Sequence, residues 1–138
     1  MSKAEFLKEA ETMKKFSNDN LVKLMAVINT EKEVALITEY MPNGNLRDYL
    51  KDGAHCGIKE HVDFAAQIAN GMAYLESKGC VHCDLAARNI LVGETHKYMI
   101  PIVKVADFGL AKFLIGDSKK NPERIGKKPL YESVPVKW

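Results

Sequence analysis

The sequence lacks the long apolar runs of membrane and secreted proteins. No apolar stretch of signal-peptide length follows Met1, and residues 24–28 form one of the longest uninterrupted apolar runs. A membrane-spanning helix needs about 20 apolar residues, and a secretory leader needs an apolar core of its own. We therefore expect no membrane span and a cytoplasmic location.

A strong excess of charge of either sign is also absent. The 20 Lys and Arg residues nearly balance the 18 Asp and Glu residues, which gives a net charge of +2. This balance argues against nucleic acid or a membrane surface as the main partner. With 138 residues, 46% of them hydrophobic and 28% charged, the chain has the composition of one globular domain and not of a disordered segment.

Cysteine is scarce, with three residues: Cys56, Cys80 and Cys83. An odd number without a secretory signal favours reduced thiols over a disulfide framework. Cys80 and Cys83 form a C-x-x-C pair, to which His55 and Cys56 could add zinc ligands. This is weak evidence for a zinc site, because the familiar zinc patterns combine two such pairs.

The pattern of apolar residues predicts a mixture of helices and strands. Phe6, Ala10 and Met13 recur at helical spacing. Apolar runs at 21–28 and 34–38 predict two antiparallel strands, because a short polar stretch separates them. A short helix is expected at 46–50, and strands are expected at 90–92 and 102–106.

The clearest predicted helix precedes Gly79, which is a typical C-terminal stop. Six residues recur at the spacing of one helical face: Val62, Ala65, Ala66, Ala69, Met72 and Ala73. Because most of these side chains are small, we expect this face to pack closely against a core.

Two motifs carry the chemistry of the chain. Residues 82–89 read HCDLAARN, and residues 107–109 read DFG. In phosphoryl transfer, an aspartate accepts the proton of the attacking hydroxyl group, while amide and carboxylate oxygens hold Mg²⁺ on the phosphates. Asp84, Asn89 and Asp107 are the side chains of these types. The alternative for Asp84 is an ordinary loop aspartate that caps a turn.

Together with TEYM at 38–41 and FLKEA at 6–10, these motifs occur in the order found in one family. The chain resembles the protein tyrosine kinase domain, particularly that of the cytoplasmic Src and Tec type, over nearly all of its length. The resemblance implies an α+β, two-lobed protein kinase-like fold that is incomplete. Residues 1–39 would be a remnant of the N-terminal lobe. Residues 40–138 would be the hinge and the first part of the C-terminal lobe, with the catalytic loop and activation segment.

The resemblance also implies roles for the motif residues, with Mg²⁺ and ATP as cofactors. Asp84 would be the catalytic base, and Asn89 and Asp107 would be the Mg²⁺ ligands. Arg88 would lie near the transferred phosphoryl group and the attacking tyrosine. Serine and threonine kinases usually carry a lysine where this chain has Ala86, so the resemblance favours tyrosine as the acceptor.

Nucleotide-binding residues follow from the same resemblance. Glu39 and Met41 belong to the hinge, whose backbone groups bind the edge of adenine, with Thr38 as the gatekeeper behind it. Leu91 would be the apolar floor under the base, although plain core packing explains the same residue. Glu9 would be the helix glutamate that pairs with a strand lysine. Three further residues are expected near the ribose: Gly44, Asn45 and Asp48.

The chain departs from the family pattern in several places. It has neither the glycine-rich loop nor the strand lysine that bind the phosphates, and it stops at Trp138 before the large C-terminal helices. The expected consequences are exposed apolar helix faces and little activity of the 138 residues alone. Cys83 replaces the usual arginine, and the stretches 93–101 and 113–133 are longer than usual. The role of Tyr131 in the second stretch stays open.

Two hypotheses of function remain from the sequence. The first is a protein tyrosine kinase that transfers the γ-phosphoryl group of Mg-ATP to tyrosine in a protein substrate, with no nucleic acid as partner. SH2 or SH3 domains would then belong to the full-length protein. The alternative is a non-catalytic, pseudokinase-like remnant that acts as a binding partner or regulator.

Overall fold

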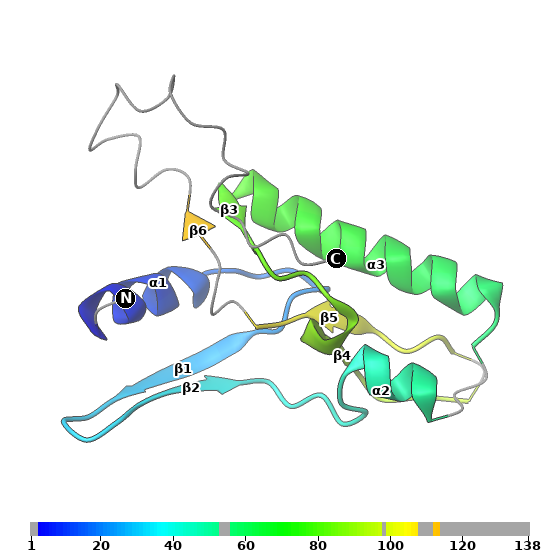
Figure 1. Ribbon diagram of the computed structural model, residues 1–138, viewed down its shortest axis with the longest axis horizontal. Coiled ribbons are helices and arrows are strands. Elements are labelled where there is room, and N and C mark those ends of the chain that lie inside the picture. The colour runs from blue at the N-terminus through cyan, green and yellow to red at the C-terminus, as the bar shows by residue number, and fades with distance from the viewer. Residues whose placement is uncertain (1–2, 53–55, 98, 108–111, 114–138) are drawn as a thin grey trace.

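Helices and small antiparallel sheets make up the part of the chain that the structure describes, as the α+β resemblance implies (Figure 1). The computed structural model describes residues 3–52, 56–97, 99–107 and 112–113. The side chains of residues 5, 8, 9, 12, 112 and 113 are not part of this description. Residues 114–138 of the expected activation segment, with Tyr131 among them, lie outside the described residues.

The N-terminal part consists of α1 (Lys3–Met13) and a hairpin of β1 (Leu24–Asn29) and β2 (Val34–Thr38). The strands are antiparallel, as predicted, with Val27 opposite Leu36. Ala10 and Met13 of α1 are buried against Leu24 of β1, so the helical spacing did identify the packed face. The predicted first strand is three residues too long at its start.

Leu21 and Val22 leave the hairpin because they pair with Val105, whereas the Lys23 carbonyl still accepts the Glu39 N–H that follows β2. Leu21 forms a parallel bridge with Val105, and the Val22 N–H donates to the Val105 carbonyl at 2.9 Å. The segment between α1 and β1 therefore ties the hairpin to the central sheet. That sheet consists of β4 (Ile90–Val92) and β5 (Val103–Val105), close to the predicted strands.

A short helix, α2 (Leu46–Lys51), follows the hairpin as predicted and begins at the N-cap Asn45. The side-chain oxygen of Asn45 accepts the Asp48 N–H at 2.9 Å. Asp48 pairs with the Asn45 amide and with Arg47, and these contacts hold the pKa of its carboxyl group below the ordinary value.

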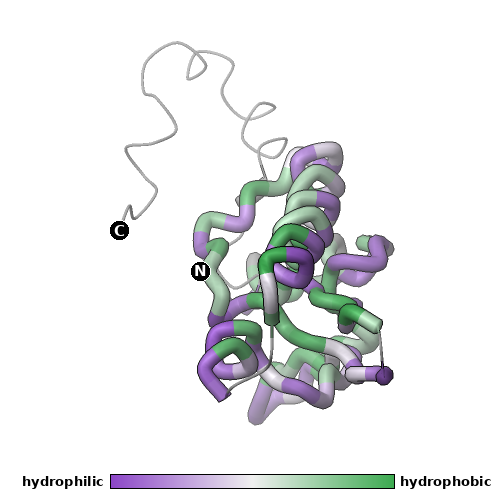
Figure 2. The backbone as a smooth tube through the Cα atoms, turned by 90° about the vertical axis from the view of Figure 1, so that its right-hand side faces the viewer, coloured by the Kyte–Doolittle hydropathy of each residue, from purple (hydrophilic) through white to green (hydrophobic). Residues whose placement is uncertain are grey.

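The long helix, α3 (Ile58–Ser77), packs on β5 with a different face from the predicted one. Its buried residues are Phe64, Gly71 and Leu75. Val62 is 65% exposed. Four predicted core alanines are exposed as well: Ala65, Ala66, Ala69 and Ala73. The prediction was wrong because α3 has apolar residues on more than one face, and the bulkier face covers the sheet. Hydrophobic and hydrophilic residues alternate along this helix in Figure 2.

The main core lies between α3, α2 and the β4–β5 sheet. It contains nine buried residues: Leu21, Leu46, Phe64, Leu75, Cys80, Ile90, Val92, Val103 and Val105. A further pair, β3 (Cys80–Val81) with β6 (Lys112–Phe113), was not predicted from the sequence. None of the described helices is long and apolar enough to cross a membrane.

Candidate functional site

The HCDLAARN motif forms a loop between β3 and β4 that ends in the short 3₁₀ helix η1 (Ala87–Asn89). His82 anchors this loop, because its side chain is 1% exposed and bonds at both nitrogens. Its Nε2 lies 2.8 Å from the Ala106 carbonyl oxygen, and its Nδ1 accepts the Asp84 N–H at 3.2 Å. This pairing corresponds to a neutral imidazole with its hydrogen on Nε2.

Of the three predicted catalytic residues of this loop, Arg88 and Asn89 both contact Asp84. Arg88 Nη2 donates to Asp84 Oδ1 at 2.6 Å, and Asn89 Nδ2 donates to Asp84 Oδ2 at 3.0 Å. The same Asn89 nitrogen donates to the Asp84 backbone carbonyl at 2.8 Å. Asp84 is therefore held in one orientation by a cation on one carboxylate oxygen and an amide on the other.

Asp107 directly follows Ala106, whose backbone N–H and carbonyl are both bonded to the catalytic loop. The Ala106 N–H donates to the Asn89 carbonyl at 2.8 Å, and the Ala106 carbonyl pairs with His82. Asp107 itself is exposed and has a φ of 59°, in the left-handed region that a non-glycine residue adopts rarely. The segments that carry Asn89 and Asp107 therefore lie side by side, as phosphoryl-transfer chemistry requires.

The oxygen atoms of Asn89 and Asp107 fit a magnesium ion. Mg²⁺ takes hard oxygen ligands and is usually held by one or two side chains together with phosphates and water. The described hydrogen bonds of the Asn89 side chain use its nitrogen, which leaves the amide oxygen for a cation. Among the described residues, no group of three or more His, Cys, Asp or Glu could hold a metal ion. The zinc alternative at Cys80 and Cys83 thus has no such cluster among the described residues, and His55, one of its possible ligands, lies outside them.

The predicted adenine-binding residues come together in part. Met41 and Ala106 are buried in one small cluster with Val22, and Leu91 packs against it. Thr38, the predicted gatekeeper, ends β2 opposite Leu24 and is exposed. Glu9 lies within α1, but its side chain lies outside the described set, and its predicted pairing stays untested.

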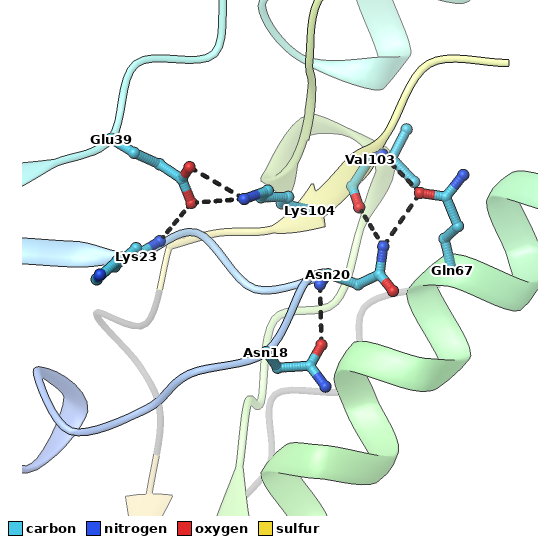
Figure 3. Close-up of polar contacts among 7 residues, drawn as sticks. All are labelled: Asn18, Asn20, Lys23, Glu39, Gln67, Val103 and Lys104. Atoms are coloured by element: carbon cyan, nitrogen blue, oxygen red, sulfur yellow. Dashed lines mark hydrogen bonds and ion pairs between the residues drawn. The ribbon is translucent and has the colours of Figure 1, made fainter. Parts of the chain in front are cut away.

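Glu39 uses its carboxylate for structural contacts (Figure 3). The Lys23 N–H donates to Glu39 Oε1 at 2.7 Å, and Lys104 Nζ lies 3.0 Å from both carboxylate oxygens. The Glu39 N–H donates to the Lys23 carbonyl at 3.0 Å. Of the Glu39 backbone, the carbonyl group is thus the part left for a base. Sequence reasoning missed Lys104, since its partner is 65 residues away.

The residues predicted near the ribose line one open hollow next to the hinge. Gly44, Asn45 and Asp48 form its wall together with four others: Pro42, Asn43, Tyr49 and Asp52. These three residues are close in the sequence and share one hollow, and their role near a ribose stays a prediction.

Comparison with known proteins places the chain clearly. The family model described as protein tyrosine and serine/threonine kinase matches residues 1–138. The chain is 51% identical to tyrosine protein-kinase src-1 of Caenorhabditis elegans, 46% to tyrosine-protein kinase Fgr of Mus musculus and 44% to tyrosine-protein kinase ABL2 of Mus musculus. All of this chain is aligned in each case. It spans 25%, 25% and 11%, respectively, of the length of these relatives.

Proposed function

Since the chain belongs to the family of protein tyrosine and serine/threonine kinases, we propose that it is part of a protein tyrosine kinase domain. In this role it transfers the γ-phosphoryl group of Mg-ATP to tyrosine side chains of a protein substrate. The observation that carries the proposal is the contact of Asp84 with both Arg88 and Asn89, next to the segment that leads to Asp107.

Asp84 acts as the base in this proposal. Its carboxylate accepts the proton of the tyrosine hydroxyl group as the oxygen attacks the γ-phosphorus. Arg88 is half exposed, so its guanidinium group can turn from Asp84 toward the charge that develops on the transferred group. Asn89 and Asp107 would hold Mg²⁺, which when bound neutralises charge on the phosphates.

The cluster of Val22, Met41, Leu91 and Ala106 supports a site for the adenine ring of ATP. An apolar surface beside hinge backbone groups is suited to a flat base that also needs hydrogen bonds at its edge. The neighbouring hollow with Asn45 and Asp48 then takes the ribose. Thr38 and Glu39 complete the hinge side of this nucleotide site, and Glu9 is assigned to the phosphate side.

We assign residues 1–39 to the N-terminal lobe of the domain and residues 40–138 to the hinge and first part of the C-terminal lobe. Tyrosine as the acceptor rests on Ala86, which stands where serine and threonine kinases usually have lysine, and on the tyrosine kinases among the relatives. A cytoplasmic location and SH2 or SH3 domains in the full-length protein belong to the same proposal. No observation favours the non-catalytic alternative.

The test is Asp84→Asn in the full-length protein, assayed for phosphate transfer from ATP to a tyrosine-containing peptide. Loss of a general base reduces turnover by about 100- to 10,000-fold, and we expect a loss in this range. Glu76→Gln serves as the matched control, because Glu76 is an exposed carboxylate on α3. Undiminished phosphorylation in Asp84→Asn contradicts the proposed role.

A further inference from the structure

On one edge of β5, Val105 bonds to the backbone of Asn20 and Val22, whereas the backbone groups of Val103 bond to side chains. Its other edge pairs with β4, with Val103 opposite Val92. On the first edge, the Val103 N–H donates to Gln67 Oε1 at 2.8 Å, and the Val103 carbonyl accepts from Asn20 Nδ2 at 3.0 Å (Figure 3). A buried strand edge must have its backbone groups satisfied, and here two amide side chains do so.

The Gln67 amide group has four partners, which determine how it is oriented. Its Oε1 accepts from Val103 and also from Asn20 Nδ2 at 3.1 Å. Its Nε2 donates to Asp63 Oδ1 at 2.6 Å and to the Pro101 carbonyl at 3.3 Å. Two acceptor bonds and two donor bonds are what an amide can make, so a carboxylate at the same place would lose both donors.

Asn20 connects the same edge to the N-terminal part of the chain. It is 7% exposed. Its Oδ1 accepts from Asn70 Nδ2 at 2.8 Å, and its backbone carbonyl accepts the Val105 N–H at 2.8 Å. A buried amide with all its partners present restricts motion, whereas an unsatisfied one is costly. Asn20 and Gln67 therefore hold β5 against α3 from Val103 to Val105.

The position of β5 determines where Asp107 lies. Asp107 follows Val105 by two residues, and both peptide groups of the intervening Ala106 are bonded to the catalytic loop. A strand advances about 3.3 Å per residue, whereas Mg²⁺ binds oxygen at about 2.1 Å in a nearly ideal geometry. A slip of β5 by even part of one residue would therefore move the Asp107 carboxylate out of binding distance.

We propose that Gln67 and Asn20 are positioning residues for Asp107. By bonding the outer edge of β5, they keep the carboxylate of Asp107 at the distance from Asn89 at which both can bind the same Mg²⁺ on a nucleotide. This proposal rests on the proposed function, because it takes Asp107 as a magnesium ligand. It adds two residues, remote from the reacting atoms, on which the affinity for the metal depends.

The first variant is Gln67→Glu in the full-length protein. It keeps an oxygen for Val103 but turns a second, negative oxygen toward Asp63 and Pro101. We expect the Mg²⁺ concentration at half-saturation of ADP binding to rise about 3- to 30-fold, because couplings of this kind change equilibria by such factors. Titration calorimetry with Mg²⁺ and ADP measures the change without any catalytic turnover.

The matched variants are Asp63→Asn and the double variant Gln67→Glu with Asp63→Asn. The single Asp63→Asn change keeps an acceptor for Gln67 Nε2, so its Mg²⁺ dependence should equal that of the wild type. In the double variant the amide of residue 63 donates to the new carboxylate. The half-saturating Mg²⁺ concentration should therefore return most of the way to the wild-type value. If Gln67→Glu does not fold, the double variant still provides the comparison with the wild type.

Melting temperatures separate positioning from simple stabilisation. An unchanged Mg²⁺ dependence in Gln67→Glu, accompanied by a lower melting temperature, overturns the proposal, since Gln67 would then only support the fold. A wild-type protein that binds no Mg-ADP overturns it as well. Failure of the proposed function alone looks different: Asp84→Asn keeps full phosphorylation while the Gln67 variants still shift Mg²⁺ binding.

Discussion

Asn89 holds Asp84 at two points, with one amide nitrogen bonded both to the Asp84 carboxylate at 3.0 Å and to its backbone carbonyl at 2.8 Å. The residue proposed to bind the metal is thus the residue that orients the proposed base. Any change at Asn89 affects two functions at once. A substitution at Asn89 therefore tests metal binding and the orientation of the base in one experiment.

The change Asn89→Ala should lower turnover and raise the Mg²⁺ requirement together. It removes the amide oxygen proposed as a ligand and the amide hydrogens that orient Asp84. Loss of an outer-sphere partner typically costs about 10- to 100-fold in metal affinity, and loss of a ligand should cost at least as much. A Mg²⁺ titration of peptide phosphorylation measures both effects. If turnover falls while the half-saturating Mg²⁺ concentration stays the same, Asn89 orients the base but does not bind the metal.

The ion pair between Glu39 and Lys104 should contribute to stability more than an exposed pair does. The two side chains are 27% and 19% exposed, whereas Arg47 and Asp48 are about half exposed at 53% and 49%. We expect a coupling of about 1 kcal/mol for Glu39 with Lys104, and a clearly smaller one for the exposed pair.

Double-mutant cycles in chemical unfolding measure this difference. The variants are Glu39→Gln with Lys104→Met, and Asp48→Asn with Arg47→Met as the reference cycle. Equal couplings for the two pairs would show that partial burial adds nothing to the interaction between Glu39 and Lys104.

Asp48 should titrate below the ordinary aspartate pKa because the Asn45 amide and Arg47 favour its charged form. Since the folded pKa lies below the unfolded value, the stabilisation is fully present above the unfolded pKa and is lost as the pH falls through the folded pKa. NMR titration of the Asp48 carboxyl group measures the pKa directly. Asn45→Ala should raise it; an unchanged pKa in this variant would rule out the amide as the main cause.

Local patterns predicted the elements that local interactions determine. The hairpin, α2, β4 and β5 lie close to where alternation and turn residues placed them. The catalytic loop could also be predicted, because Asp84, Arg88 and Asn89 are within five residues of one another. In a short loop, sequence proximity nearly guarantees spatial proximity. The pair of two-residue strands β3 and β6 is too short to leave a periodic signal.

Contacts between distant segments could not be predicted in the same way. Asn20 meets Val103 across 83 positions. Gln67 is one of several polar residues in α3, and the sequence does not distinguish it from those that face solvent. The wrong face of α3 has a related cause. Helical spacing identified a continuous face of alanines, and that face was predicted to be the buried one. Only the position of β5 shows that the face with Phe64 and Leu75 covers the sheet instead.

Gly71 marks the closest approach of α3 to the loop that carries Asn20. A Cβ atom at this position would lie 2.6 Å from the Asn20 carbonyl oxygen, which belongs to the backbone and accepts the Val105 N–H. In an exposed helix, glycine to alanine stabilises by about 1 kcal/mol, but overpacking costs about 1–3 kcal/mol. The clash should win, so Gly71→Ala should lower the free energy of unfolding.

The matched control for Gly71→Ala is Ala69→Gly, at an exposed position of the same helix. It should destabilise by about 1 kcal/mol through helix propensity alone, with no effect on the β5 edge. Hydrogen exchange then distinguishes the two variants: only Gly71→Ala should speed exchange of the Val105 amide, because that amide donates to the displaced Asn20 carbonyl. If Gly71→Ala proves more stable than the wild type, the loop can move away from α3 at little cost, and the backbone contact at Asn20 does not constrain β5.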